Sequence, residues 1–295
     1  MKILGISASY NEQGNSAILT QQALRGAEEA GAQVELVRLP DLTIDDCRGC
    51  ALCLYRDREC FLKDDLHFLF AKMREADAFI LGTPCHFQEA NSMVKRLIDR
   101  SFYRTYIGDL QGKAAAILVS HSKRGWTDRV FPQITSWLRG LGVHVVNQSL
   151  FHSQYPSEVL LYRDQLEKAH AMGQGLVRAL REKDYTFQGK EGLCPLCHDN
   201  VIRIRPGRGE AECADCHIPA TLTVADDGGI KVTFAPEALA QDRYRSESMA
   251  RHFSYHSKPA LAYTRATRKR AKEGKAALEG GFAPVKPARP AEVVD

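Results

Sequence analysis

The sequence of 295 residues has little of what marks membrane, secreted or nucleic-acid-binding proteins. Its longest apolar runs, such as residues 114–119, are far shorter than the roughly 20 residues of a membrane-spanning helix. The apolar residues 1–6 run directly into polar ones and lack the core of a signal peptide. The formal net charge is only +4, which is too small to indicate nucleic-acid binding. We therefore expect a cytoplasmic protein with no membrane or nucleic-acid partner.

Cysteine, in contrast, is plentiful and clustered. The nine cysteines form one quartet near residue 50, one quartet near residue 205, and a single residue, Cys85, between them. A cytoplasmic chain keeps its thiols reduced, so clusters of this kind indicate metal binding or catalysis rather than disulfides. Cys85 itself is either a reactive thiol or a small buried residue.

Residues 1–184 alternate between patterns typical of strands and of helices. The expected strands are 2–6, 33–39, 78–82, 114–120 and 143–148, and the expected helices are 16–30, 64–75, 92–102, 126–141 and 158–183. Five strands that alternate with helices predict an α/β domain with a doubly wound, five-stranded parallel sheet covered on both faces. Ligands bind such folds beyond the carboxyl ends of the strands.

The rest of the chain changes character twice. Residues 186–236 are Gly-rich, carry the second cysteine quartet and contain two short β stretches, 201–205 and 221–234, which predicts a small β-rich domain. Residues 237–295 hold twelve basic and seven acidic side chains. We expect a basic helix over 264–278 and disorder over 280–295, where three prolines stand and little can be buried.

The loop of residues 5–16 joins the first strand to the first helix. It offers hydroxyl groups, an amide side chain and the free backbone N–H groups of a helix N-terminus, which are the donors that a phosphate dianion needs. A plain polar turn capped by Ser16 explains the same residues.

Three segments resemble the flavodoxin-like NAD(P)H-dependent FMN reductases. The first loop matches their opening motif at Ser7, Ser9 and residues 14–16, with Asn11 where they often have Arg. Residues 82–87 are similar to the loop that flanks the flavin ring in that family, although Cys85 and His86 replace the usual Val and Tyr. Residues 93–100 resemble a helix of the same family. The matches follow the same order over residues 1 to about 180.

This resemblance implies a flavodoxin-like domain that binds FMN, with a third loop after the fourth strand also touching the flavin. The residues it places at FMN are Ser7, Ser9, Asn11, Gly14, Asn15, Ser16, Thr83, Pro84, Cys85, His86, Phe87, Ser120, Arg124 and Gly125. No catalytic acid is identified, and His86 and His121 are candidates by position alone. We expect Lys95, Asp99 and Arg100 to form an ion-pair network on a helix.

The first quartet consists of Cys47, Cys50, Cys53 and Cys60. Three thiolates spaced three residues apart, with a fourth slightly further on, can converge on a [4Fe-4S] cluster, which takes four cysteine ligands. The spacing is similar to the compact motif of the iron-sulfur flavoproteins, a branch of the same reductase family. Structural thiols or a redox-active pair among the first three cysteines are the alternatives.

The second quartet consists of Cys194, Cys197, Cys213 and Cys216. Two Cys-x-x-Cys pairs fifteen residues apart, flanked by β stretches, predict a zinc ribbon with Zn2+ held by four thiolates. A histidine follows each pair, which also fits the attachment motif of c-type haem, but that haem requires export of the chain. A rubredoxin-like iron site is a further alternative.

Together these features predict an FMN-dependent oxidoreductase. We expect it to transfer electrons from NAD(P)H or ferredoxin to an acceptor through FMN and a [4Fe-4S] cluster, and the resemblance implies a homodimer or larger homo-oligomer. One alternative is a cluster-free NAD(P)H-dependent FMN or quinone reductase. Another is a redox sensor or scaffold that acts through the zinc ribbon and the basic tail.

Overall fold

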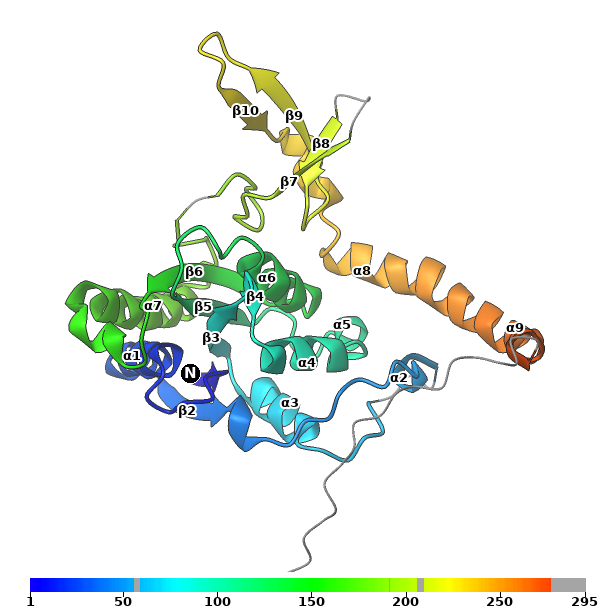
Figure 1. Cartoon of the computed structure of the whole chain (residues 1–295), viewed down its shortest axis with the longest axis horizontal. Coiled ribbons are helices and arrows are strands. Elements are labelled where there is room, and N and C mark those ends of the chain that lie inside the picture. Colours follow the sequence, from blue (N-terminus) through cyan, green and yellow to red (C-terminus); the bar gives the residue numbers. More distant parts are fainter. Residues whose placement is uncertain (56–58, 191, 206–209, 277–295) are drawn as a thin grey trace, which may run out of the picture. The chain divides into compact units, whose positions relative to one another are not determined.

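The computed structural model describes residues 1–55, 59–190, 192–205 and 210–276 (Figure 1). The chain forms two compact units, Met1–Arg251 and His252–Asp295. Both domain boundaries that the sequence predicts, near 185 and near 237, lie inside the first unit.

A parallel sheet forms the centre of the first unit. Its strands follow the order β2-β1-β3-β5-β6, with β1 at Lys2–Ser7, β2 at Gln33–Arg38, β3 at Ala78–His86, β5 at Ala114–His121 and β6 at His144–His152. The five predicted strands and the flavodoxin-like, doubly wound class are confirmed. The structure adds a short strand, β4 (Glu89–Ala90), which folds back antiparallel onto the end of β3.

Helices cover both faces of this sheet, and each face has its own apolar core. On one face pack α3 (Leu66–Glu75), α4 (Ser92–Arg100) and α6 (Val130–Gly140), and on the other α1 (Asn15–Glu29) and α7 (Arg163–Glu182). Side chains alternate along each strand, so Leu4 contributes to the first core and Ile3 to the second. A Cβ at Gly173 would lie 1.8 Å from the carbonyl oxygen of Ala23, so glycine lets α7 approach α1 closely.

Two predicted helices start later than the sequence indicates. The helix expected from residue 126 begins at Val130, because the backbone N–H of Arg129 donates to the carbonyl of Gln88 instead of entering a helix (3.2 Å). The helix expected from residue 158 begins at Arg163 and follows a short 3-10 helix, Glu158–Leu161. There the backbone N–H of Val159 donates to the side chain of Asn15 (3.1 Å). At Arg129 a tertiary hydrogen bond takes an N–H that the predicted helix would use, whereas the bond from Val159 only satisfies an N–H that is free at the start of any helix.

The second cysteine quartet belongs to a four-stranded antiparallel sheet in the order β10-β9-β8-β7. The strands are β7 (Ile202–Arg205), β8 (Glu210–Cys213), β9 (Pro219–Val224) and β10 (Ile230–Thr233). The sequence predicts two β stretches here. The longer one is split into β9 and β10 by a turn in which Gly228 has a φ of +81° and the N–H of Ala225 bonds to the carbonyl of Gly229.

The segment that follows this small sheet also belongs to the first unit, as far as Arg251. The 3-10 helix Pro236–Gln241 places Ala238 in the apolar core around the second quartet. α8 (Ser246–His252) follows it. Two further short helices, α2 (Leu52–Tyr55) and α5 (Arg104–Ile107), lie earlier in the chain. Residues 237–242, which the sequence assigns to the basic tail, therefore contribute to the same packed unit as the flavodoxin-like domain.

The second unit contains a π-helical turn, Phe253–Ser257, and α9 (Lys258–Ala276). The helix predicted over 264–278 is thus present and begins six residues earlier. Residue 278 and the stretch 280–295, where we expect disorder, lie outside the described residues. Across the described part of the chain, the helices are too short or too polar to cross a bilayer.

Candidate functional site: a flavin crevice and two cysteine centres

A crevice opens at the carboxyl ends of β1, β3, β5 and β6, as expected for a doubly wound sheet. Its volume is about 710 Å3. It is lined from the predicted set by Ser9, Asn11, Gly14, Asn15, Ser16, Pro84, Cys85, His86 and Ser120. The structure therefore brings residues from all three predicted loops to one place.

The N-terminus of α1 borders the crevice. Gly14 is the N-cap, and no side chain accepts a hydrogen bond from the first turn, so its backbone N–H groups have no capping partner. A Cβ at Gly14 would lie 2.3 Å from Ser9 Oγ and 2.9 Å from the carbonyl oxygen of Asn11. Only glycine lets Ser9 and Asn11 pack this closely against the start of α1, and we call this corner of the crevice the cradle at Gly14. The N–H groups at the start of the helix can bind a phosphate group there.

Three residues of the set predicted at FMN make hydrogen bonds within this loop or to a neighbouring loop. Ser7 is buried, and its Oγ accepts a hydrogen bond from the N–H of Ser9 (3.4 Å). Asn11 Oδ1 accepts from the N–H of Gln13 (2.9 Å). The Asn15 side chain donates to the carbonyl of Tyr155 (2.8 Å) and so ties the loop after β6 to α1. The side chain of Asn15 is therefore engaged, while its backbone remains at the helix N-terminus.

Of the predicted residues at the end of β3 and just after it, some line the crevice and others do not. Thr83 is buried and donates to the carbonyl of Pro84 (3.1 Å), which places its side chain behind the crevice. Phe87 is 88% exposed and does not line the crevice. Its backbone is left-handed (φ +49°), and Arg129 Nη2 donates to its carbonyl (3.2 Å). Burial raises the pKa of Cys85, whose Sγ donates to the carbonyl of Trp126.

The loop after β5 brings His121 to the crevice beside Ser120, whereas Arg124 and Gly125 do not line it. His121 packs edge-on against His152 of the neighbouring strand, with ring centres 5.3 Å apart. Burial lowers the pKa of His121, so its neutral form is favoured. Its Nδ1 lies 3.1 Å from the carbonyl oxygen of Lys123 and donates to it, which leaves Nε2 as an acceptor.

Sequence reasoning missed the contribution of α4 and of the loop after β6. Asn91 caps α4 and donates to the carbonyl of Ala8 (2.5 Å), so it joins α4 to the phosphate loop. Met93 and Arg96 of α4 also line the crevice, as do residues 153–156. A polar residue before a helix signals a cap, so Asn91 could have been found from the sequence. The others carry no such signal.

The first cysteine quartet surrounds a second, smaller cavity of about 200 Å3. Cys47 and Cys50 are exposed, whereas Cys53 and Cys60 are half-buried. The apolar part of the lining is formed by Leu54, Phe61, Leu62 and Phe102. Burial raises the pKa of Cys53, and the nearby thiols of Cys60 and Cys47 raise it further. A single water needs roughly 10–15 Å3 of such space, so the cavity is large for one ion.

One helix, α4, borders both cavities. Met93 and Arg96 line the flavin crevice, and Asp99 and Arg100 line the cysteine cavity. At 1.5 Å per residue these ends of the helix are about 10 Å apart. The Lys95–Asp99 pair is the helix-surface ion pair that the sequence predicts, but Arg100 is buried and binds Asp64. Arg100 therefore forms an ion pair as expected, but with a residue outside the helix, because tertiary packing covers the last turn of α4.

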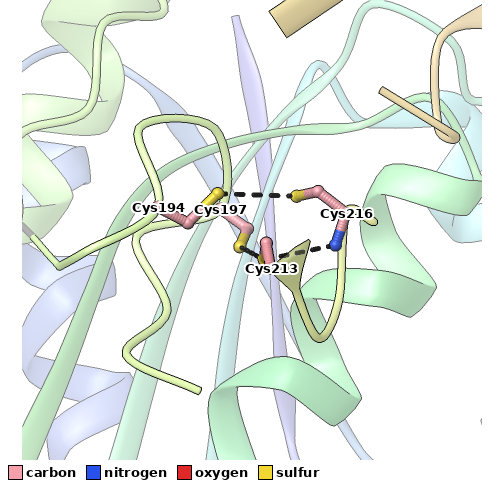
Figure 2. Close-up of side chains that lie close together, drawn as sticks. All are labelled: Cys194, Cys197, Cys213 and Cys216. Atoms are coloured by element: carbon pink, nitrogen blue, oxygen red, sulfur yellow. Dashed lines mark hydrogen bonds between the residues drawn. The ribbon is translucent and has the colours of Figure 1, made fainter. Parts of the chain in front are cut away.

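In the second quartet the sulfur atoms converge on one point. Figure 2 shows them turned toward one another from two chain turns. All four residues are buried, and their sulfurs lie within 4.8 Å of one another. The separations are 3.9 Å for Cys194–Cys216 and 3.5 Å for Cys197–Cys213. Four sulfurs placed tetrahedrally at 2.3 Å from zinc are about 3.8 Å apart, so this quartet fits one tetrahedral metal ion.

Helix α6 connects this centre to the flavodoxin-like domain. Arg139 Nη1 donates to Cys216 Sγ (2.6 Å), and its Nη2 binds Asp242 (2.5 Å). One turn earlier, Ser136 donates to Asp215 (2.5 Å). Residues of α6 therefore contact the metal centre and the segment after it.

Comparison with known proteins agrees with this geometry. The family described as NADPH-dependent FMN reductase matches residues 1–156. An iron-sulfur flavoprotein of Methanocaldococcus jannaschii is 34% identical over 135 residues, which are 45% of this chain and 69% of that protein.

Two further similarities extend over most of the chain. A flavone synthase of Aspergillus candidus is 26% identical over 286 residues, which cover 85% of this chain and 87% of that protein. A solved structure of a flavone reductase superposes with a TM-score of 0.81 over 97% of this chain and 100% of that chain, at 21% identity. The fold of most of the chain therefore has a solved counterpart.

Proposed function

Because the chain belongs to the NADPH-dependent FMN reductase family, in its iron-sulfur flavoprotein branch, we propose that it transfers electrons through FMN and a [4Fe-4S] cluster. The donor would be NAD(P)H or ferredoxin. The observation that carries the proposal is that the flavin crevice and the four-cysteine cavity border the same helix, about 10 Å apart along α4. FMN would exchange two electrons with one partner and single electrons with another, which is what a one-electron cluster beside it requires.

The crevice residues would bind and orient FMN. The phosphate would lie in the cradle at Gly14 and face the N–H groups of the first turn of α1, while the Ser9 hydroxyl donates to the carbonyl of Asn11 and shapes the loop (2.7 Å). Pro84, His86 and Ser120 would border the ring. Asn91 and Asn15 hold the surrounding loops together through hydrogen bonds to Ala8 and Tyr155. His121 Nε2 could hold a proton at the crevice, since its Nδ1 is engaged with Lys123.

Cys47, Cys50, Cys53 and Cys60 would hold the cluster. In the described part of the chain, the ribbon cysteines are the group whose donor atoms lie close enough for a single ion, and the first quartet does not belong to it. Four cysteines around an apolar cavity instead suit a group that takes one thiolate at each of four iron atoms.

The second quartet would hold one structural Zn2+. All four ligands are buried, which leaves no open coordination position for a substrate. A small domain with so little apolar core depends on its metal for folding.

We also propose a homodimer or larger homo-oligomer. Large aromatic side chains at the rim of the crevice are strongly exposed, with Tyr10 at 82% and Tyr155 at 70%. Exposed apolar groups around a binding site are typical of surfaces that a ligand or another subunit covers.

Anaerobic purification followed by metal, sulfide and flavin analysis tests the proposal. We expect about four irons, four sulfides, one zinc and one FMN per chain. Fewer than about two irons per chain in the presence of FMN would overturn the cluster.

Two variants act as matched controls in this experiment. Cys50→Ser combined with Cys53→Ser is expected to remove iron and keep zinc. Cys197→Ser is expected to remove zinc and keep iron. Loss of both metals from either variant would contradict the assignment of one metal centre to each quartet.

A second candidate function is the two-electron reduction or oxidation of a planar aromatic compound such as a flavone, with no cluster involved. The similarity to flavone synthase over 85% of the chain supports it, as does the exposed aromatic rim of the crevice. The test is anaerobic oxidation of NADPH that depends on an added flavone. Turnover that survives Cys50→Ser and Cys53→Ser would favour this function over electron transfer through a cluster.

A further inference from the structure

Arg100 is a buried cation at the C-terminal end of α4. Its side chain is 1% exposed, and that of its partner Asp64 is 2% exposed. Nη1 donates to Asp64 Oδ2 (2.6 Å) and to the carbonyl of Asp45 (2.7 Å), and Nη2 donates to Asp64 Oδ1 (3.2 Å). Both terminal nitrogens of the guanidinium are therefore held in place.

The third nitrogen of the Arg100 guanidinium, Nε, is buried and has no acceptor among the residues that the structure describes. A buried N–H of a cation without an acceptor is unfavourable, so its presence in a native structure indicates that a bound group supplies the acceptor. Arg100 lines the cavity that the four cysteines surround, and that cavity is where an acceptor can lie.

The charges around the cavity show why Arg100 matters there. Asp64 neutralises the guanidinium, so the pair brings a hydrogen-bond donor to the cavity without a net charge. Asp99, which also lines the cavity, is engaged by Lys95 on the solvent side. Burial lowers the pKa of Arg100, but Asp64 and the nearby Cys60 raise it more, so Arg100 stays protonated. Among the described residues, Arg48 is the other cation of the lining, and it is exposed.

We propose that Arg100 donates a hydrogen bond from Nε to a sulfur of the [4Fe-4S] cluster, either a cluster sulfide or the Cys60 thiolate, and thereby raises the reduction potential of the cluster. The inference rests on the proposed function, because it requires the cluster. Asp64 and the carbonyl of Asp45 act as positioning groups that fix the guanidinium.

The physical reason is the charge that reduction adds. A reduced cluster carries one more negative charge, most of it on iron and sulfur, so a hydrogen bond to sulfur stabilises the reduced form more than the oxidised form. Removal of the donor is expected to make the cluster harder to reduce.

The experiment is a redox titration of the purified holoprotein, followed by electron paramagnetic resonance, with Arg100→Lys as the test variant. Lysine keeps the charge and can still pair with Asp64, but it lacks the Nε–H. We expect wild-type iron and sulfide content and a reduction equilibrium constant about tenfold lower, which is a shift of about 59 mV toward negative potential.

Two further variants keep the test decisive. Arg100→Met with Asp64→Asn removes every N–H donor of the side chain and leaves no buried charge alone, so we expect the same negative shift. Arg104→Lys is the matched control, because Arg104 is also buried and paired with carboxylates but does not line the cavity. We expect its potential to equal that of the wild type.

The outcomes distinguish a failure of the proposed function from a failure of the role assigned to Arg100. Wild-type protein without iron and sulfide would overturn the proposed function and this inference with it. A cluster at full occupancy whose potential is the same in the wild type, Arg100→Lys and the double variant would leave the proposed function standing and overturn the role of Arg100.

Discussion

The two cysteine quartets use the same ligand type in opposite ways. In the ribbon all four residues are buried, and their sulfurs approach one another to between 3.5 and 3.9 Å in the closest pairs. In the first quartet two cysteines are exposed, two are half-buried, and all four stand around a cavity. The difference teaches that the spacing of sulfurs in space, rather than their number, separates a site for one ion from a site for a larger group.

Backbone geometry produces this contrast. Each ribbon pair ends in a left-handed histidine, His198 at φ +57° and His217 at φ +59°, so each turn closes tightly. The N–H of Cys216 also donates to Cys213 Sγ (3.4 Å). The first three cysteines of the first quartet lie close together in the chain around left-handed Gly49 and Ala51, and Cys53 belongs to α2.

An arginine accompanies each quartet, buried at Arg100 and half-buried at Arg139. Arg139 reaches a ribbon sulfur directly and holds Asp242 with its other terminal nitrogen. Burial lowers the pKa of Arg139, whereas Cys216 and Asp242 raise it more, so it remains a cation. Arg100, in contrast, keeps one donor without a partner. At the ribbon, the arginine already donates to a cysteine sulfur. At the cysteine cavity, the Nε–H of Arg100 has no acceptor among the described residues and is available to a ligand.

The largest expected effect is the loss of the ribbon metal. Cys197→Ser leaves three thiolates in a buried site, so we expect zinc content to fall from about one per chain to near zero. The ribbon should lose folding free energy on the order of 10 kcal/mol and exchange its amide hydrogens freely. Elemental analysis and hydrogen exchange measure both changes. Full zinc and full protection in this variant would break the comparison, because the quartet would then not be a metal site.

The next largest effect concerns the arginine of the ribbon. Arg139→Met removes the donor to Cys216 and leaves Asp242 without its partner in a buried position, so we expect a loss of about 3–5 kcal/mol in the free energy of unfolding. Urea denaturation measures it. Arg163→Met is the control, since its ion pair with Glu167 is exposed and should contribute less than about 0.5 kcal/mol. Equal losses in the two variants would contradict the role of Arg139.

A smaller effect is expected at the flavin crevice, which is not lined by any cysteine of the two quartets. Gly14→Ala would put a Cβ 2.3 Å from Ser9 Oγ, so the phosphate loop must shift and FMN affinity should fall about tenfold, or about 1.4 kcal/mol. Quenching of FMN fluorescence gives the affinity. Gly274→Ala, which meets no atom within 4 Å, serves as the control. Iron and zinc content should stay constant in both variants, and an unchanged FMN affinity in Gly14→Ala would rule out the cradle.

The smallest effect is the pH dependence of the Arg100–Asp64 pair. Burial raises the pKa of Asp64, but the hydrogen bond from Arg100 and those from two backbone N–H groups lower it more, so its pKa in the folded state lies below 3.8. The ionised pair therefore contributes its full stability above about pH 4, and this contribution is lost as the pH falls through the lowered pKa. Unfolding measured between pH 5 and pH 2 should show a weaker acid dependence in Asp64→Asn with Arg100→Gln. Parallel curves for the variant and the wild type would contradict the assignment.

Much of the fold could be predicted from the sequence, because the signals are local. Apolar runs such as residues 114–119 mark buried strands, and all five appear at the expected places. The late start of α6 could not be predicted, since it depends on a hydrogen bond from Arg129 to Gln88. A residue distant in sequence competes there with the helix for the same backbone group.

The candidate site shows the same division. The loops of the crevice were predicted, and nine of the fourteen residues placed at FMN line it. The side chain of Asn15 and the exposure of Phe87 were not foreseen, because the loop after β6 engages the first and the left-handed backbone turns the second outward.

The sequence by itself determined which residues form strands, which cysteines can act together and where a helix N-terminus meets the crevice. These properties follow from periodicity and from the short reach of neighbouring side chains. The tertiary structure alone decided that one quartet closes on itself while the other surrounds a cavity. It also decided that Arg100 and Arg139 are the cations beside them, because burial and pairing of a charge depend on residues such as Asp64 and Asp242 that lie far away along the chain.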